Sequence, residues 1–345
     1  MIRVAFFDAK AYDKPSFELY GGPKDVRFKY LETKLNEDTV ELAKGCQAVC
    51  VFVNDTVSAA VIEKLYEYRV RLIALRSAGY NNVDLQAAYG RIHVVHVPAY
   101  SPYAVAEHAM ALLLTSVRRI HKAYNRTREF NFSLSGLTGF DFHGKTVGVV
   151  GTGKIGRIFI DICRGFGMNV VAYDLFPAKD SGIDYVPLDE LLERSDIISL
   201  HCPLTDATRH MINTGAIEKM KKGVVIVNTS RGGLIDAEAL LEGIKARKIG
   251  AACLDVYEEE ADVFFEDRSG HILNDDLLSR LISMPNVIVT SHQAFLTEEA
   301  LNNIAETTVN NILSCFEKDG MCDNELCYRC GNIEQCKKER KKKCF

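Results

Sequence analysis

The sequence predicts an α/β protein built on doubly wound parallel sheets. Short apolar runs rich in valine and isoleucine alternate with longer helical patterns over most of the 345 residues. Many of these runs are apolar on both faces, as is typical of parallel strands covered by helices on each side. A glycine-rich turn joins one such run directly to a helix, in the arrangement of a strand–helix–strand unit.

Ten apolar runs predict strands, and two long amphipathic patterns predict helices. The helical patterns follow Pro102 and Thr297. The predicted strands lie at residues 2–7, 47–53, 71–76, 92–97, 146–151, 169–173, 196–201, 223–229, 250–255 and 286–290. Because strands and helices alternate in order, consecutive strands should run parallel within each sheet.

A domain boundary is expected near residue 98, where a proline-punctuated loop gives way to the helix after Pro102. Residues 1–98 form one α/β unit, and strands resume in a second unit at "GKTVGVVG". The helical pattern from Thr297 to about Phe316 could rejoin the first unit. A polar, basic, cysteine-rich tail follows from about residue 320.

Composition and charge exclude several classes of protein. Hydrophobic residues make up 47% of the chain and charged residues 26%, and the formal net charge is −4, so nothing indicates a nucleic-acid or membrane partner. No apolar run reaches the length of a membrane span, and "MIRVAFFDAK" lacks the features of a signal peptide. We therefore expect a cytoplasmic protein.

Eleven cysteines fall into two groups. Six are scattered singly in mostly apolar stretches, which favours buried, inert thiols in a reducing compartment rather than a disulfide framework: Cys46, Cys50, Cys163, Cys202, Cys253 and Cys315. The other five crowd into the tail.

The strongest local motif is a dinucleotide-binding fingerprint. A strand runs into Gly151, Gly153 and Gly156, a helix follows, and a second strand ends at Asp174, 18 residues after the last glycine. The glycines permit a tight turn, a close approach of the pyrophosphate and close helix packing, while the helix N-terminus attracts the phosphates. Asp174 would bind the ribose hydroxyls and repel a 2′-phosphate, which favours NAD over NADP. A binder of S-adenosylmethionine remains an alternative at this point.

Three polar residues follow predicted strands of the second unit. Arg231 follows strand 223–229, Glu260 lies five residues beyond Asp255, and His292 follows strand 286–290. Ligands of open α/β sheets bind at the carboxyl ends of strands. An arginine can hold a carboxylate through two hydrogen bonds, and a histidine paired with a glutamate can donate a proton. The set suits the reduction of a 2-oxo acid, although each residue alone is more often structural.

Several motifs together resemble those of the D-isomer-specific 2-hydroxyacid dehydrogenases. They are "LRSAGYNNVD", "VPAYSPYAVAEHA", "VVGTGKIG", "SLHCPLT", "IVNTSRGGLID", "LDVYEEE" and "SHQAF". The resemblance spans residues 1 to about 320 and is greatest to the NAD-dependent fermentative D-lactate branch. It implies two Rossmann-like domains, with the NAD-binding domain (101–296) inserted in a substrate domain (1–100 plus 297–320), a tail at 321–345, and a homodimer or higher homo-oligomer.

The resemblance also assigns roles to individual residues. Arg231, Glu260 and His292 fall on the family's catalytic positions. Cofactor contacts beyond the three glycines fall on Lys154, Ile155, Asp174, Cys202, Pro203, Thr208, Thr229, Ser230 and Asp255. Substrate contacts fall on Ser77, Ala78, Gly79, Tyr100, Arg231 and Phe295.

The implied reaction is the reversible reduction of pyruvate by NADH to D-lactate, with His292 as the proton donor. Phe295 follows the histidine where many members carry a smaller residue, which favours a pocket narrowed for a methyl group. Two alternatives stay open: a dehydrogenase of a bulkier 2-oxo acid, and an NAD-sensing, corepressor-like binding protein.

The tail has no counterpart that we associate with the family. Cys327 and Cys330 form a C-x-x-C pair, and Cys322 and Cys336 lie nearby, so the four thiols could bind a soft metal ion. The spacing matches no standard zinc motif, and a polar tail with free thiols is an equal alternative. In either case we expect the tail to be dispensable for catalysis.

Overall fold

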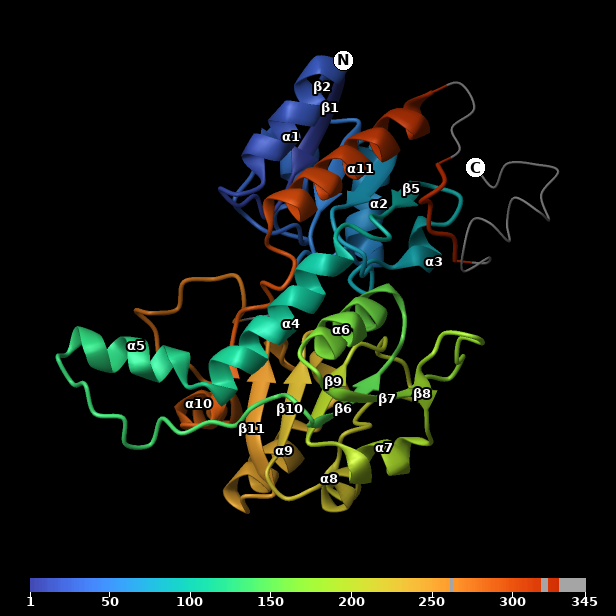
Figure 1. Cartoon of the computed structure of the whole chain (residues 1–345). Coiled ribbons are helices and arrows are strands. Elements are labelled where there is room, and N and C mark those ends of the chain that lie inside the picture. Colours follow the sequence, from blue (N-terminus) through green and yellow to red (C-terminus); the bar gives the residue numbers. More distant parts are fainter. Residues whose placement is uncertain (261–262, 318–321, 329–345) are drawn as a thin grey trace. The chain divides into compact units, whose positions relative to one another are not determined.

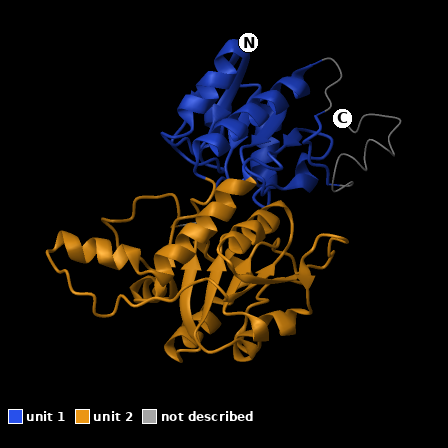
Figure 2. Cartoon of the chain, viewed as in Figure 1, with its two compact units in different colours: residues 1–101, 296–345 blue, residues 102–295 orange. Residues whose placement is uncertain are grey.

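The computed structural model describes residues 1–260, 263–317 and 322–328. The chain divides into two compact units (Figure 2). Unit 1 comprises Met1–Ser101 and the chain from Leu296 onward, and unit 2 comprises Pro102–Phe295. Unit 2 is therefore inserted between two segments of unit 1.

Unit 1 contains a five-stranded parallel sheet (Figure 1). Its strands are β1 (Ile2–Phe6), β2 (Val26–Tyr30), β3 (Ala48–Val51), β4 (Leu72–Leu75) and β5 (His93–Val95), in the order β2-β1-β3-β4-β5. Its helices are α1 (Lys14–Gly21), α2 (Ala59–Glu67), α3 (Leu85–Ala88) and α11 (Glu298–Phe316), with 3-10 turns η1 (Gly22–Lys24) and η2 (Val40–Ala43). Since the strands are parallel, their carboxyl ends share one edge of the sheet.

Helix α11 returns the chain to unit 1 after unit 2 is complete. The Thr297 side chain caps it by accepting a hydrogen bond from the backbone N–H of Ala300. The helix packs on α1 and β4, and Ser16 donates a hydrogen bond to Asn302 at 2.9 Å. The sheet of unit 1 is thus covered by a helix from the far end of the sequence.

The described part of the predicted tail, residues 322–328, packs on unit 1. Glu325 forms an antiparallel bridge with Val95 of β5, and its carboxylate lies 2.7 Å from Nδ1 of His93. Leu326 donates its backbone N–H to Val94 and joins the hydrophobic core. Unit 1 therefore holds residues 322–328 by core packing and by a single β-bridge.

Unit 2 contains a seven-stranded parallel sheet. Its strands are β6 (Thr146–Val150), β7 (Asn169–Tyr173), β8 (Asp184–Tyr185), β9 (Ile197–Leu200), β10 (Val224–Asn228), β11 (Ile249–Leu254) and β12 (Val287–Val289). Their order is β12-β11-β10-β9-β6-β7-β8. The chain steps outward from β6 in both directions, which is the doubly wound pattern that the sequence predicts.

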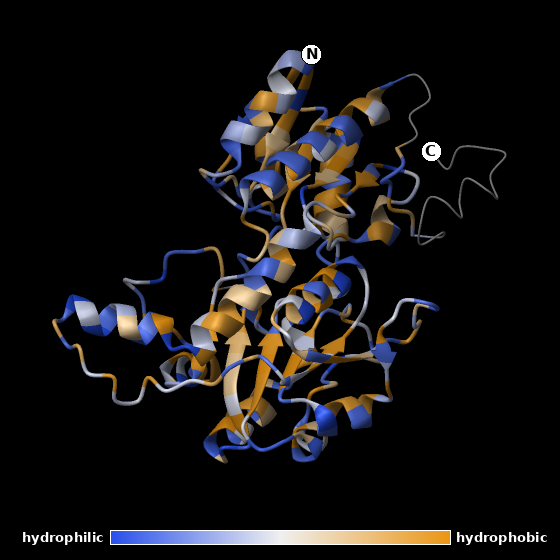
Figure 3. Cartoon of the chain, in the orientation of Figure 1, coloured by the Kyte–Doolittle hydropathy of each residue, from blue (hydrophilic) through white to orange (hydrophobic). Residues whose placement is uncertain are grey.

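Helices cover both faces of this second sheet. The face with α4 (Pro102–Val117) and α6 (Lys154–Gly165) holds Val225 and Val227 of β10, while Val224 and Ile226 point into the opposite core. That opposite core contains residues from α7 (Leu188–Arg194), α8 (Thr214–Lys219), α9 (Ala237–Lys245) and α10 (Asp276–Ser283). Burial on both faces explains the continuous apolar runs, and Figure 3 shows these strands as the hydrophobic centre.

All ten predicted strands are present in the structure. Two further strands, β2 and β8, were not predicted. β2 is an edge strand whose residues alternate between buried and exposed, and β8 has only two residues. Neither forms the continuous apolar run that marks a central strand.

Burial also bears out the expectation for the scattered cysteines. Cys46, Cys50, Cys163, Cys202, Cys253 and Cys315 are all buried thiols. Burial raises the pKa of Cys202 to about 11 and that of Cys163 to about 12. In the part of the chain that the structure describes, no helix is both long and apolar enough to cross a membrane.

Candidate active site

The three predicted catalytic residues lie beyond the carboxyl ends of three adjacent strands. β10, β11 and β12 are neighbours in the sheet, and they are followed by Arg231, Glu260 and His292 respectively. All three residues belong to unit 2. The parallel order of the strands brings their following loops to one edge, as the sequence analysis expects.

Glu260 and His292 form a direct pair. Oε1 of Glu260 lies 2.7 Å from Nδ1 of His292, and both side chains are 21% exposed. The other carboxylate oxygen of Glu260 accepts the backbone N–H of Tyr257 at 3.0 Å. Because a carboxylate only accepts hydrogen bonds, Nδ1 carries the proton, and Nε2 is the nitrogen available for exchange with a substrate.

Asp255 holds the loop that carries His292. It is fully buried, and it accepts hydrogen bonds from the backbone N–H groups of Gln293 and Ala294, both at 2.9 Å. Thr290 and His108 contact the same carboxylate. Burial alone would raise the pKa of Asp255, but these hydrogen bonds outweigh burial and hold the pKa below its usual range.

The backbone of the His292 loop is also unusual. His292 has φ of +54°, and its backbone N–H donates to the carbonyl of Asp255 at 2.7 Å. A non-glycine residue in this region is uncommon and is sustained by its surroundings. The Asp255 anchor and this turn together set the direction of the imidazole.

Arg231 sits in a loop whose backbone is fixed by Asn228. The Asn228 amide donates to the carbonyl of Arg231 at 2.9 Å and accepts the N–H of Ser230 at 3.0 Å. The guanidinium makes a hydrogen bond to the Ser230 carbonyl at 2.7 Å. Since a guanidinium has five N–H donors, donors remain for a substrate carboxylate.

The glycine turn at the end of β6 has the geometry that a dinucleotide needs. Gly151 has φ of +92°, and a side chain there would meet the backbone of His201 and Cys202. A side chain on Gly156 would meet the carbonyl of Gly151, whereas the space around Gly153 is open. The turn is therefore tight on the protein side and open where a pyrophosphate would approach.

Two further observations fit a bound dinucleotide. The hydroxyl of Thr229 is buried and has no hydrogen-bond partner among the described residues. Asp174 ends β7 and accepts hydrogen bonds from Thr152 and from the N–H of Phe176. Burial would raise the pKa of Asp174, but these bonds hold it below its usual range, so the carboxylate is charged at neutral pH.

The other predicted cofactor residues lie around this turn. Lys154 and Ile155 begin α6, directly after Gly153. Cys202 and Pro203 follow β9, where Thr208 donates a hydrogen bond to the Pro203 carbonyl at 2.8 Å. Ser230 donates to the Cys202 carbonyl at 2.6 Å, and so joins the loops after β9 and β10.

The predicted substrate residues of unit 1 follow β4. Ser77 donates its hydroxyl to the Gly79 carbonyl at 2.8 Å, and His96 contacts the Ala78 carbonyl at 3.0 Å. Among the described residues, the backbone N–H groups of Ala78 and Gly79 have no hydrogen-bond partner. The loop therefore presents two donors. Tyr100 is held by Asn303, which donates to its carbonyl at 2.7 Å.

The structure adds residues that the sequence analysis did not identify. Buried Arg76 precedes the Ser77–Gly79 loop and donates to the carbonyls of Phe7 and Asp8, at 3.1 and 2.7 Å. In unit 2, His108, Thr290 and His210 support the loops around the catalytic residues. Arg76 and His108 lie inside two of the quoted motifs, but their roles could not be assigned from the sequence because their partners are distant along the chain.

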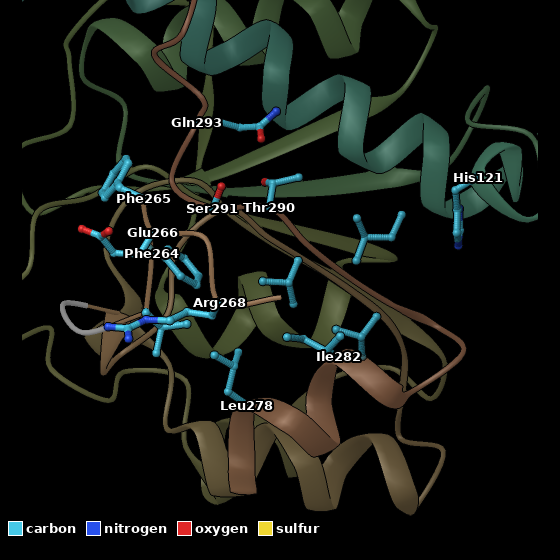
Figure 4. A pocket seen from close by; sticks show the side chains of 14 residues that line it. His121, Phe264, Phe265, Glu266, Arg268, Leu278, Ile282, Thr290, Ser291 and Gln293 are labelled. Carbon is cyan, nitrogen blue, oxygen red and sulfur yellow. The ribbon is translucent and has the colours of Figure 1, made fainter. Parts of the chain in front are cut away.

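A cavity of about 790 Å³ lies beside the His292 loop but contains none of the predicted site residues (Figure 4). Ser291 and Gln293, the neighbours of His292, line one side, and Phe264, Phe265 and Arg268 line another. Phe295, which the resemblance assigns to the substrate pocket, is buried but does not line this cavity.

Two of the four tail cysteines proposed as metal ligands, Cys330 and Cys336, lie outside the described residues. Cys322 and Cys327 are both buried, and Cys322 donates a hydrogen bond to Asn311 at 3.2 Å. Among the described residues, no cluster of three or more His, Cys, Asp or Glu side chains could hold a metal ion. The metal site in the tail stays a prediction.

Comparison with known proteins places the chain in a family. Residues 110–294 match the model of "D-isomer specific 2-hydroxyacid dehydrogenase, NAD binding domain". The chain is 52% identical over 327 residues to a 2-hydroxyacid dehydrogenase homolog of Haemophilus influenzae, covering 94% of this chain and 98% of the relative. It is 50% identical over 329 residues to the D-lactate dehydrogenase of Escherichia coli, covering 94% of this chain and 100% of the relative.

The fold agrees with solved structures of similar proteins. The structure described as the pyruvate reductase of Chlamydomonas reinhardtii superposes with a TM-score of 0.86 at 46% identity, covering 91% of this chain and 96% of that one. A match over almost the whole length of both chains excludes the alternative that the glycine motif binds S-adenosylmethionine. Arg231, Glu260 and His292 all lie within the residues that match the NAD-binding domain of the family. The chain belongs to the D-isomer specific 2-hydroxyacid dehydrogenases.

Proposed function

We propose that the protein is an NAD-dependent D-lactate dehydrogenase that reduces pyruvate to D-lactate and catalyses the reverse reaction. The Glu260–His292 pair carries the proposal, because it supplies an oriented proton donor at the same sheet edge as Arg231 and the dinucleotide turn. The names of the Escherichia coli and Chlamydomonas relatives support the choice of substrate.

The proposed roles follow from the chemistry of each side chain. Bound NADH would supply a hydride to the ketone carbon. Arg231 would bind the substrate carboxylate and polarise the ketone, and Nε2 of His292 would give its proton to the ketone oxygen. Glu260 would stabilise the resulting charge on the imidazole and keep the ring oriented. In lactate oxidation, neutral His292 would take the proton back.

Ser77, Ala78 and Gly79 are proposed to bind the substrate carboxylate through backbone N–H groups. The two unpartnered N–H groups of this loop support that role. Tyr100 and Phe295 are proposed to bound the side-chain pocket. A pocket limited by aromatic rings favours the methyl group of pyruvate over longer chains, by about 1–3 kcal/mol per methylene.

The cofactor residues keep the roles that the resemblance implies. We propose that Gly151, Gly153 and Gly156 receive the pyrophosphate with Lys154 and Ile155, and that Asp174 binds the ribose. Cys202, Pro203, Thr208, Thr229 and Ser230 would contact the remaining part of NAD, with the buried Thr229 hydroxyl as a direct donor or acceptor. Asp255 anchors the His292 loop through two backbone N–H groups. We propose that it also contacts the nicotinamide.

We propose that unit 2 is the cofactor domain and that unit 1 is the substrate domain. The fingerprint and the catalytic three all lie in unit 2. A cytoplasmic location is proposed as well, because the six scattered cysteines are buried thiols that form no disulfide among the described residues, which suits a reducing compartment.

A homodimer is the proposed assembly. Helix α5 (Ile120–Arg128) and the chain after it expose large apolar side chains, and a groove of about 600 Å³ runs between α4 and α6. Acidic Glu107 and Asp161 border the groove, while α5 ends in Arg126 and Arg128. A second copy offers both surfaces, so the contact can be made twice around a twofold axis. The exposed apolar residues are Ile120, Tyr124, Phe130, Phe132 and Leu134.

Initial rates of NADH oxidation across a panel of 2-oxo acids test the function. We expect the highest kcat/KM with pyruvate, lower values as the side chain lengthens, and D-lactate as the product. A maximum at a bulkier acid would favour the first alternative. Tight NADH binding without turnover on any acid would favour the corepressor-like alternative. Sedimentation of wild type and Phe132→Asp tests the homodimer, with a monomeric variant expected.

A further inference from the structure

A second carboxylate–imidazole pair lies two residues along the chain from the catalytic one. Oε1 of Glu258 lies 2.7 Å from Nε2 of His210, and Arg209 contacts the same oxygen at 2.9 Å. The Glu258 side chain is only 22% exposed. Glu258 therefore does not belong to a freely solvated acidic face, although it adjoins Glu259 and Glu260 in the sequence.

His210 connects this pair to the loop of Arg231. Its backbone N–H donates to the Gly233 carbonyl at 2.8 Å, and two residues later Ile212 donates to the Leu234 carbonyl at 3.1 Å. The backbone of His210 has φ of +49°, and Asn213 donates to its carbonyl. The residue thus holds an uncommon turn while its side chain and its N–H bind two different loops.

The Arg231 loop and the Glu260 loop also touch directly. A side chain on Gly232 would overlap the carbonyl group of Tyr257, so the two backbones lie in contact. The N–H of Tyr257 in turn binds the catalytic Glu260. A displacement of Glu258 would therefore shift two catalytic side chains. It would shift Arg231 through the contact with Gly232, and it would shift Glu260 through Glu259, the residue between them.

The same pair reaches the cofactor residues. His210 lies in the loop that follows β9, and the same loop contains Pro203 and Thr208. Thr208 donates a hydrogen bond to the Pro203 carbonyl at 2.8 Å. Three loops consequently meet at His210 and Glu258: the loop proposed to contact NAD, the loop of Arg231 and the loop of Glu260.

We propose that His210 and Glu258 form a positioning pair that fixes these three loops for binding of NADH and the 2-oxo acid. The inference rests on the proposed roles of Arg231, Glu260 and His292. Neither His210 nor Glu258 touches the reacting atoms in this proposal. The pair acts by holding the groups that do, and Arg209 brings a positive charge to the same Glu258 oxygen beside the catalytic carboxylate.

Loss of the pair should weaken binding more than it lowers turnover at saturation. If the loops move, NADH and pyruvate must reorder them on binding, so both KM values rise. A defect that only unfolds a fraction of the molecules reduces the concentration of active enzyme. It therefore lowers the apparent kcat and leaves both KM values unchanged. The split between KM and kcat therefore separates positioning from simple structural damage.

The experiment compares His210→Ala, Glu258→Ala and the double variant in the full-length enzyme. We expect each single change to raise the KM for NADH and for pyruvate by roughly tenfold, and the double variant to be no worse than the poorer single one, because both remove the same contact. His210→Gln, whose amide can still donate to Glu258, should recover most of the loss. His271→Ala and Glu242→Ala, both in exposed positions of unit 2, are the matched controls.

Unchanged KM values in both single variants, or multiplied effects in the double variant, would overturn the positioning pair. His292→Ala and Arg231→Lys are assayed beside these variants. If those two keep wild-type turnover, the proposed function is wrong, whatever His210 does. If they lose turnover while His210→Ala and Glu258→Ala bind both substrates normally, the function stands and this inference alone fails.

Discussion

Oε1 of Glu260 lies 2.7 Å from Nδ1 of His292, although the two residues follow different strands and are separated by 32 positions. Backbone contacts hold both partners: Tyr257 donates to Glu260, and His292 donates to the Asp255 carbonyl. The pair is therefore oriented before any substrate arrives. An oriented imidazole that has a carboxylate on one nitrogen can exchange a proton at the other.

Replacing Glu260 with Gln should narrow the pH range of pyruvate reduction. Without the anionic partner the protonated imidazole is less stable, so the rate should begin to fall at a lower pH than in wild type. His292→Ala should lower kcat by roughly 10²–10⁴-fold, since it removes the proton donor. The measurement is the pH dependence of kcat, with exposed Glu242→Gln as control. A pH profile of Glu260→Gln that overlays wild type would contradict the pairing.

Replacing Arg231 with Lys should weaken the use of pyruvate by roughly 10- to 100-fold in kcat/KM. An ammonium keeps the charge but cannot make two parallel hydrogen bonds to a carboxylate, and one charge-assisted hydrogen bond is worth about 1.5–3 kcal/mol. The affinity for NADH, measured by fluorescence titration, should change little. Exposed Arg194→Lys is the control and should behave as wild type. Equal kcat/KM for Arg231→Lys and wild type would remove Arg231 from the substrate site.

Replacing Asp174 with Ala should reduce the preference for NADH over NADPH by roughly tenfold or more. The charged carboxylate at the end of β7 would lie beside the 2′-phosphate of NADPH, and the change removes that repulsion. Part of the NADH affinity should fall too, because Thr152 loses its acceptor. The test compares kcat/KM for the two cofactors, with exposed Asp189→Ala as control. An unaltered ratio would show that Asp174 does not select the cofactor.

The sequence is sufficient to predict the central strands, because their apolar residues form continuous runs. Strands β6, β9, β10 and β11 are central and buried on both faces, so each is a continuous apolar run. Because parallel strands share a carboxyl edge, the positions of Arg231 and His292 after β10 and β12 already place both residues at that edge. The edge strand β2 was missed because its outer face meets water and its pattern is mixed.

Contacts between loops could not be predicted in the same way. The pairing of Glu260 with His292 is expected from the sequence, but nothing in the run Glu258-Glu259-Glu260 shows that Glu258 pairs with His210. Those pairings depend on the path of the backbone after β11 and on the turns at His210 and His292, both of which have positive φ. The anchor role of Asp255 likewise depends on N–H groups 38 and 39 residues away.

The stability of the protein should depend on Asp55 in a direction opposite to that of most carboxylates. Asp55 is 1% exposed, and burial raises its pKa from 3.8 to about 6 despite hydrogen bonds from the backbone of Phe52 and Leu35. The folded state therefore binds a proton between about pH 6 and pH 4, where the unfolded chain does not. Stability from this group rises as the pH falls through that window, by at most about 1.4 kcal/mol per pH unit.

Urea unfolding of wild type and Asp55→Asn, from about pH 7.5 to about pH 5, checks this dependence. Asn does not titrate. The free energy of unfolding of wild type should therefore increase relative to that of the variant as the pH falls. Exposed Asp38→Asn should show no such divergence. A difference between wild type and Asp55→Asn that stays constant with pH would mean that Asp55 is charged throughout the range.

Two truncations should separate the part of the tail that unit 1 holds from the part beyond it. A chain ending at Tyr328 keeps Glu325 on His93 and Leu326 in the core, so we expect the turnover, both KM values and the melting temperature of the full chain. A chain ending at Met321 loses both contacts. Burial of a leucine contributes about 1.5–3 kcal/mol and the lost partner of His93 costs about 1 kcal/mol more, so the melting temperature should fall by roughly 5–10 °C.

Leu326→Ala in the full-length chain is the matched point variant, and it should reproduce about half or more of that loss, because a buried Leu→Ala change costs about 2–5 kcal/mol. Both truncations should keep the wild-type KM for NADH at temperatures where they are folded, since the predicted cofactor residues lie in unit 2. Zinc and iron analysis of the full chain and of the chain ending at Tyr328, both purified without air, tests the proposed metal ligands Cys330 and Cys336 at the same time. If the chain ending at Met321 has the same melting temperature as the full chain, the packing of residues 322–328 contributes nothing to stability. If instead the chain ending at Tyr328 is destabilised, residues beyond Tyr328 stabilise the fold.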